Sequence, residues 1–139
     1  MKSTELRVGN LIDGHYDYDD GEPLWIQCKV LALDSVGLTE HEIWVEGDGF
    51  NETYYDFKGI PLTEEWLLKF HNKEEIEKSV IFPNEITIYD RFLFIWKENY
   101  KYWYVVTAYR KEYLTKIEFV HEYQNFMFAL CGENLTIKP

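Results

Sequence analysis

Residues 120–132, Val-His-Glu-Tyr-Gln-Asn-Phe-Met-Phe-Ala-Leu-Cys-Gly, constrain the fold of this chain more than any other stretch. Placed on a helix at about 100° per residue, they leave one narrow polar arc, which holds His121, Glu122 and Asn125. A helix that is apolar around most of its circumference is buried on several sides. We therefore expect a buried helix over 120–131 at the structural centre of a domain, ended by Gly132.

The length and composition of the chain predict one compact domain over 1–139. Of its 139 residues, 46% are hydrophobic and 18% are aromatic, which suits an ordered fold that contains β-sheet. Two sub-lobes are compatible with the same sequence, an acidic β-meander at 1–58 and an α+β part at 59–139. The N-terminus lacks the apolar region of a signal peptide, and no apolar run reaches the roughly 20 residues of a membrane span. We therefore expect a cytoplasmic protein without a membrane partner.

Negative charge is concentrated in the first part of the chain. The net charge is −11, and residues 1–56, with 13 acidic and 3 basic side chains, carry −10 of it. A protein that binds nucleic acid needs a basic footprint, so we expect no nucleic-acid partner. Solubility is the ordinary explanation of such charge, and an acidic surface for a basic protein partner is the alternative.

Short alternating segments separated by turn residues predict a β-meander in the first part of the chain, for which an SH3-like barrel is one possible form. Its predicted strands are 5–12, 24–33, 39–46 and 51–57, with a turn-rich loop at 13–23. A linking helix is predicted near 63–71, because Thr63 can cap it and Glu64 and Glu65 follow in the first turn. The charged segment 73–79 suits either one more helical turn or an exposed connection.

The second part of the chain predicts an antiparallel sheet. Its strands lie within 80–96, broken at Pro83-Asn84 and Asp90-Arg91, and at 102–109 after a hairpin turn at 97–101. Residues 92–96 are apolar on both faces, as in a central strand. Residues 113–119 alternate like a strand, although Thr115 and Glu118 also form a capping box that would begin the last helix at 116. The alternation favours the strand.

Three segments resemble a known family. They are Glu5-Leu-Arg-Val-Gly-Asn10, Ile60-Pro-Leu-Thr-Glu-Glu-Trp-Leu-Leu-Lys-Phe70, and the 120–130 stretch followed by Gly132-Glu-Asn-Leu-Thr-Ile137. Together they are similar to short proteins of phages, prophages and anaerobic gut bacteria that have no assigned activity. This chain carries Tyr123 and Cys131 where such proteins often carry Leu and Thr. The resemblance implies a phage or mobile-element origin but no cofactor and no catalytic residue.

Four groups of residues have the composition of a functional site. The acidic loop 13–22 lacks the ligand spacing of a calcium loop. In Glu40-His41-Glu42, strand alternation separates the histidine from both carboxylates. Basic and aromatic side chains interleave at 91–116, but Asp90, Glu98, Glu112 and Glu118 neutralise that footprint. We therefore expect no metal and no cofactor.

The remaining group is the polar cluster His121, Glu122 and Asn125, in which His121 and Asn125 are i, i+4 neighbours. Neither cysteine of the chain is placed to act with His121 as a nucleophile. We expect His121 to anchor the helix to the strand or loop on which it packs.

These features predict an α+β protein with an N-terminal β-meander, a linking helix, an antiparallel sheet and a buried C-terminal helix. The functional hypothesis is a non-enzymatic accessory protein of phage origin that acts through contacts with an unidentified protein. Two alternatives stay open: an acidic decoy that mimics nucleic acid for a basic host protein, and a small-ligand binder or small enzyme with a site between the two lobes.

Overall fold

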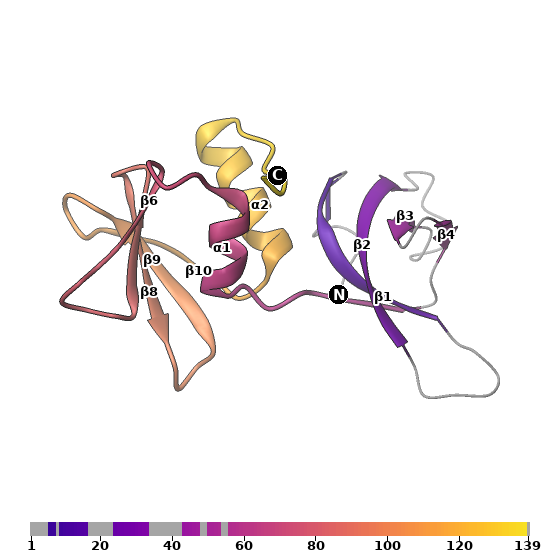
Figure 1. The fold of residues 1–139 in the computed structure, drawn as a ribbon, viewed down its shortest axis with the longest axis horizontal. Coiled ribbons are helices and arrows are strands. Elements are labelled where there is room, and N and C mark those ends of the chain that lie inside the picture. The colour runs from indigo at the N-terminus through magenta and orange to yellow at the C-terminus, as the bar shows by residue number, and fades with distance from the viewer. Residues whose placement is uncertain are drawn as a thin grey trace. The chain divides into compact units, whose positions relative to one another are not determined.

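The protein has an α+β fold (Figure 1). The computed structural model describes residues 6–7, 9–16, 24–33, 43–47, 50–53 and 56–138. Within these ranges the chain forms two antiparallel sheets and two helices. It divides into two compact units, one of residues 1–61 with 119–134 and the other of 62–118 with 135–139. The α+β class is confirmed, while the single domain and its 1–58 and 59–139 sub-lobes stay predictions.

The first unit is built on a sheet of strand order β4-β3-β2-β1-β5. Its strands are β1 (Leu11–Tyr16), β2 (Leu24–Leu33), β3 (Ile43–Gly47), β4 (Phe50–Thr53) and β5 (Asp56–Lys58). All pairings are antiparallel, and β1 lies between β2 and β5. The strand predicted at 24–33 is confirmed with both its boundaries. An SH3-like barrel stays a prediction.

Two predicted strands of this unit were wrong in their boundaries. The first was placed at 5–12, but β1 covers Leu11–Tyr16, so the strand begins later than predicted and includes residues 13–16 of the predicted loop. The cause is a turn before β1: the Asn10 side chain accepts from the Arg7 N–H at 2.6 Å, the Asn10 N–H donates to the Arg7 carbonyl, and Gly9 has φ 94°. Asn and Gly favour such a turn. The segment predicted as one strand at 51–57 forms parts of two, β4 and β5.

The second unit consists of α1 (Glu64–Phe70) and a sheet of strand order β10-β9-β8-β7-β6. The strands are β6 (Ile76–Lys78), β7 (Glu85–Ile88), β8 (Phe92–Lys97), β9 (Tyr102–Thr107) and β10 (Tyr113–Ile117). The helix lies against one face of this sheet (Figure 1) and buries Trp66, Leu67 and Phe70. As predicted, Thr63 caps α1 by accepting from the Trp66 N–H.

Most predictions for the second sheet are confirmed, including the central place of β8 and the strand, rather than helix, at 113–117. Residues 73–79 are the exception, because part of that segment pairs with β7 as the edge strand β6. The charges of this segment, among them Glu77 and Lys78, favoured a helix or an exposed connection in the sequence. Charged side chains are nevertheless common on edge strands, where they oppose pairing with a strand of another molecule.

The helix α2 (Val120–Cys131) has the predicted boundaries, and Gly132 ends it in the left-handed conformation at φ 66°. Its burial differs from the prediction. Val120, Tyr123 and Met127 are buried, whereas Phe128 and Leu130 are exposed. The buried stripe therefore has the ordinary i, i+3, i+7 spacing of an amphipathic helix.

Candidate functional site

Amide side chains of α2 bind the turn and first strand of the first unit. Gln124 Oε1 accepts from the Leu11 N–H at 2.8 Å, and Gln124 Nε2 donates to the Gly9 carbonyl at 3.1 Å. Asn125 Oδ1 accepts from Asn10 Nδ2 at 3.0 Å. We call Asn10, Gln124 and Asn125 the amide cluster. It supplies hydrogen-bond partners to backbone groups whose burial without a partner would cost free energy. The amide cluster is therefore a structural anchor.

The other two residues of the predicted polar cluster have separate places. His121 is only 2% exposed, and its ring stacks on Phe119 at 5.8 Å and 8°. Glu122 Oε1 accepts from the Phe119 N–H at 2.9 Å and so caps the N-terminus of α2. It also places a negative charge at the positive end of the helix dipole. Only Asn125 of the predicted set joins the amide cluster. Sequence reasoning missed Asn10 and Gln124.

The remaining predicted groups contribute no described site. Asp13 lies in β1, where burial raises its pKa and the charge of Lys58 offsets only part of that rise. The other carboxylates of 13–22 and the segment Glu40-His41-Glu42 lie outside the described residues. In the basic and aromatic segment, Lys97 lies over the Tyr104 ring and Lys116 over the Tyr102 ring. These lysines cover ring faces on which a base would stack.

The second unit contains a cleft that sequence reasoning missed. It has a volume of 460 Å³, within the roughly 300–1,000 Å³ of ligand pockets. Its walls come from the start of α1, the start of β7 and the paired strands β8 and β9. The lining residues are Leu62, Thr63, Glu64, Pro83, Asn84, Ile86, Trp96 and Trp103. We call it the tryptophan cleft.

Two cross-strand partners, Trp96 and Trp103, form the aromatic wall of this cleft. Their ring centroids are 5.2 Å apart and their planes are tilted by 53°. Trp103 is buried and donates its indole N–H to the Leu62 carbonyl at 2.9 Å, so it is fixed to the start of α1. Trp96 is partly exposed and donates its indole N–H to Glu98. Trp96 is therefore the indole that an incoming group can reach.

The polar atoms around the tryptophan cleft are mainly acceptors. The Asn84 amide nitrogen donates to the Trp96 carbonyl, which leaves its oxygen as an acceptor. Glu64 pairs with Lys78 at 2.9 Å, with side chains 41% and 52% exposed; exposed pairs of this kind contribute only about 0–1 kcal/mol. Hydrogen bonds from Lys101 and then from Trp96 hold the pKa of Glu98 below its ordinary value. The cleft thus combines an indole with one carboxylate, that of Glu64, while Glu98 lies outside the lining and binds the indole N–H.

An exposed apolar loop continues directly into the cleft. Val80 is 100% exposed, Ile81 80% and Phe82 54%, and the next two residues, Pro83 and Asn84, line the cleft. We call Val80–Phe82 the apolar loop. Its backbone is ordered, because the Phe82 N–H donates to Ser79 Oγ and the Glu85 N–H to the Phe82 carbonyl, each at 3.0 Å. Neighbouring apolar side chains exposed together are typical of interaction sites.

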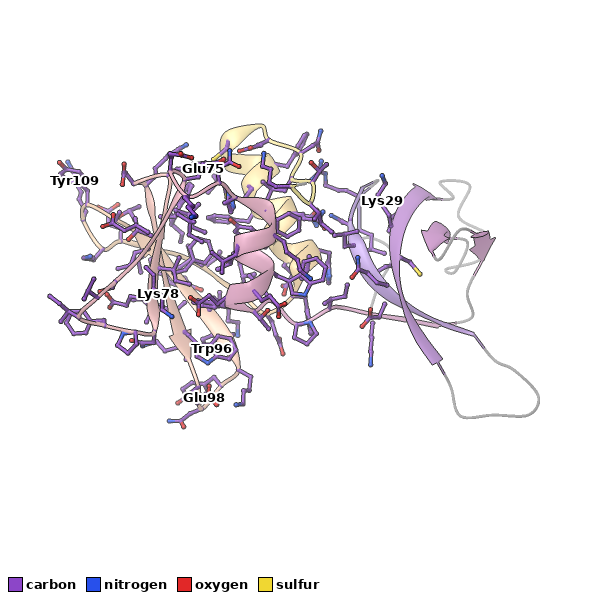
Figure 2. All side chains as sticks on the ribbon, in the orientation of Figure 1. Lys29, Glu75, Lys78, Trp96, Glu98 and Tyr109 are labelled. Carbon is purple, nitrogen blue, oxygen red and sulfur yellow. The ribbon has the colours of Figure 1, made fainter. Side chains whose placement is uncertain are left out.

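Figure 2 shows Lys78 and Trp96 on the same side of the second sheet, with Glu98 beyond Trp96 at the tip of the β8–β9 hairpin. Tyr109 lies at the opposite end of that sheet, in the β9–β10 turn (Figure 2). Because Trp96 donates its backbone N–H to the Asn84 carbonyl, the apolar loop lies at the Trp96 end. A sequence signal existed: Val-Ile-Phe stands immediately before the turn residues Pro83-Asn84, where apolar side chains lack strand neighbours.

Among the described side chains, no three His, Cys, Asp or Glu residues gather in a way that could hold a metal ion. None of the described helices has the length and apolar character needed to cross a membrane. Compared with protein-family models, curated proteins and solved structures, the chain matches none of them.

Proposed function

We propose that this protein is a non-enzymatic accessory protein of a phage or mobile element, that it is cytoplasmic, and that it acts through protein–protein contacts. The observation that carries the proposal is the apolar loop beside the tryptophan cleft. These three consecutive apolar side chains are exposed to water on an ordered turn. Covering them with another molecule would gain the hydrophobic free energy of their burial. The phage origin rests on the resemblance of the three sequence segments.

The partner that fits this surface is a protein with a basic segment. Aromatic and aliphatic side chains at the centre of an interface supply most of its affinity, while charges around them select the partner. Here Phe82 and Trp96 supply the apolar centre, and Glu64 and Glu98 lie at its edge. The net charge of −11 adds a long-range attraction for a basic protein.

Capture experiments with matched variants test this function. The wild type, Ile81→Asp and Tyr109→Asp are immobilised and exposed to a lysate of the bacterium whose genome encodes the chain. We expect a protein that the wild type and Tyr109→Asp retain and that Ile81→Asp loses, because a carboxylate at position 81 opposes desolvation of the loop. Tyr109 is the matched control, since it is 95% exposed at the other end of the same sheet.

The proposal fails if the three baits retain the same proteins or if none retains any. Circular dichroism and the thermal transition of Ile81→Asp must equal those of the wild type, as expected for a side chain that is 80% exposed.

A further inference from the structure

We infer that the tryptophan cleft binds a cationic side chain, an arginine of the protein partner, with its guanidinium over the Trp96 indole and its N–H groups directed at Glu64 and Asn84. This inference rests on the proposed function, because it names the group that the partner inserts. It goes beyond that function by assigning a binding site with a defined ligand chemistry.

The residues that line the cleft match the chemistry of a guanidinium. A guanidinium is planar, carries five N–H donors and stacks on aromatic faces. The cleft offers the complementary set: the Trp96 indole, the Asn84 amide oxygen and the Glu64 carboxylate. The hydrogen bond from the Trp96 indole N–H to the anionic Glu98 polarises the ring and strengthens its attraction for a cation. A neutral apolar side chain could donate to neither the Asn84 oxygen nor the Glu64 carboxylate.

Several other aromatic rings of the chain have a cationic side chain over them. Arg7 lies over Phe128, Lys69 over Trp66 and Arg91 over Phe92, in addition to the two lysines over tyrosines described above. In the part of the chain that the structure describes, none of these cation–ring contacts involves Trp96. Its indole instead borders the cleft, so a cation from outside can take this position.

A cation, the Lys78 ammonium, already lies at the edge of the cleft. Lys78 Nζ lies 2.9 Å from one Glu64 carboxylate oxygen and 3.2 Å from the other. Both side chains are about half exposed, so this pair exchanges readily with water and with other charges. An arginine that also stacks on Trp96 gains a contact that the Lys78 pair lacks. It can therefore share or replace Lys78 on Glu64.

A titration of the full chain followed by NMR tests the inference. The probes are N-acetyl-arginine amide, N-acetyl-lysine amide, N-acetyl-leucine amide and the neutral arginine isostere N-acetyl-citrulline amide. The readout is the indole N–H resonance of Trp96, assigned from its loss in Trp96→Phe. We expect a saturable shift that is strongest for the arginine probe, with the citrulline probe binding about threefold to fivefold more weakly, as expected for one exposed cation–ring contact.

Variants separate the cation site from general adhesion. Glu64→Gln keeps the shape of the side chain and should weaken the arginine probe about threefold, whereas the adjacent Glu65→Gln, which does not line the cleft, should leave it unchanged. Trp96→Leu should abolish saturation, as read from the backbone resonances of Asn84 and Ile86. Raising the salt concentration should weaken the arginine probe and leave the leucine probe unaffected.

An equal shift with the citrulline probe would overturn the cationic ligand and assign the cleft to a neutral polar side chain, and an equal shift with the leucine probe would assign it to an apolar one. No saturable shift with any probe would overturn the site itself. These failures are distinct from failure of the proposed function. If Ile81→Asp fails to retain a captured partner but the citrulline and arginine probes bind equally, the function is supported and the cation site is not. If the arginine probe binds specifically but no partner is captured, the cation site is supported and the function is not.

Discussion

At the scale of single residues, Gln124 ties α2 to the backbone before and at the start of β1. It is 4% exposed and uses both ends of its amide, accepting from the Leu11 N–H and donating to the Gly9 carbonyl. Gln124 lies outside the polar arc of His121, Glu122 and Asn125, in a position where burial of an amide is costly unless it is hydrogen-bonded. It is stable there because β1 supplies the backbone groups that its amide binds, and sequence periodicity carries no information about such a distant strand.

We expect Gln124→Leu to lower the free energy of unfolding by about 2–4 kcal/mol, because one buried donor and one part-buried acceptor lose their partner. Urea denaturation followed by tryptophan fluorescence measures this loss. Asn134→Ala is the matched control: it removes an exposed amide that binds Arg7 at 3.0 Å, and we expect a change below about 0.5 kcal/mol. Equal losses for the two variants would contradict the structural role of the amide cluster.

At the scale of elements, the boundaries of α2 follow from local signals in the sequence, and its end at Gly132 shows why. A Cβ at this position would meet nothing within 4 Å, but φ is 66°. The cost of a side chain is therefore conformational and not steric.

We expect Gly132→Ala to lower the free energy of unfolding by about 1 kcal/mol and Gly132→Asn to lower it less, because Asn adopts the left-handed conformation more easily. Thermal unfolding followed by circular dichroism separates the two variants. An equal or larger loss for Gly132→Asn would show that something other than backbone conformation governs the end of the helix.

The connection from α1 to β6 depends on the ionised form of Glu75. Burial by itself raises the pKa of Glu75, but hydrogen bonds from His71, Tyr89 and the Asn72 N–H, with the charge of His71, lower it below the ordinary 4.5. A carboxyl group with a lowered pKa stabilises the fold above its unfolded pKa, and this contribution is lost as the pH falls through the folded pKa.

We therefore expect Glu75→Gln to be less stable than the wild type at neutral pH, and the difference to shrink as the pH falls below about 4.5. Urea denaturation at several pH values measures it. The exposed neighbour Glu74 provides the control, since Glu74→Gln should show little difference at any pH. A gap that persists unchanged in acid would mean that Glu75 acts through its shape and not its charge.

At the scale of the whole molecule, the sequence predicted the α+β class, the second sheet and both helices, because these depend on local periodicity and capping. It did not predict contacts between distant segments. Gly59 illustrates the difference: a Cβ there would lie 2.5 Å from Cγ of Phe119, an approach that no local pattern reveals. The tryptophan cleft was missed for the same reason, since its walls come from α1, β7 and the β8–β9 hairpin.

We propose that the apolar loop and the tryptophan cleft form a surface that a protein partner covers. Site-specific photocrosslinking tests it most directly, with p-benzoylphenylalanine placed at position 82 or, as control, at position 109, in cells that produce the chain. We predict a defined crosslinked adduct from position 82 that is absent from position 109. The same adducts from both positions, or no adduct from position 82, would contradict the claim.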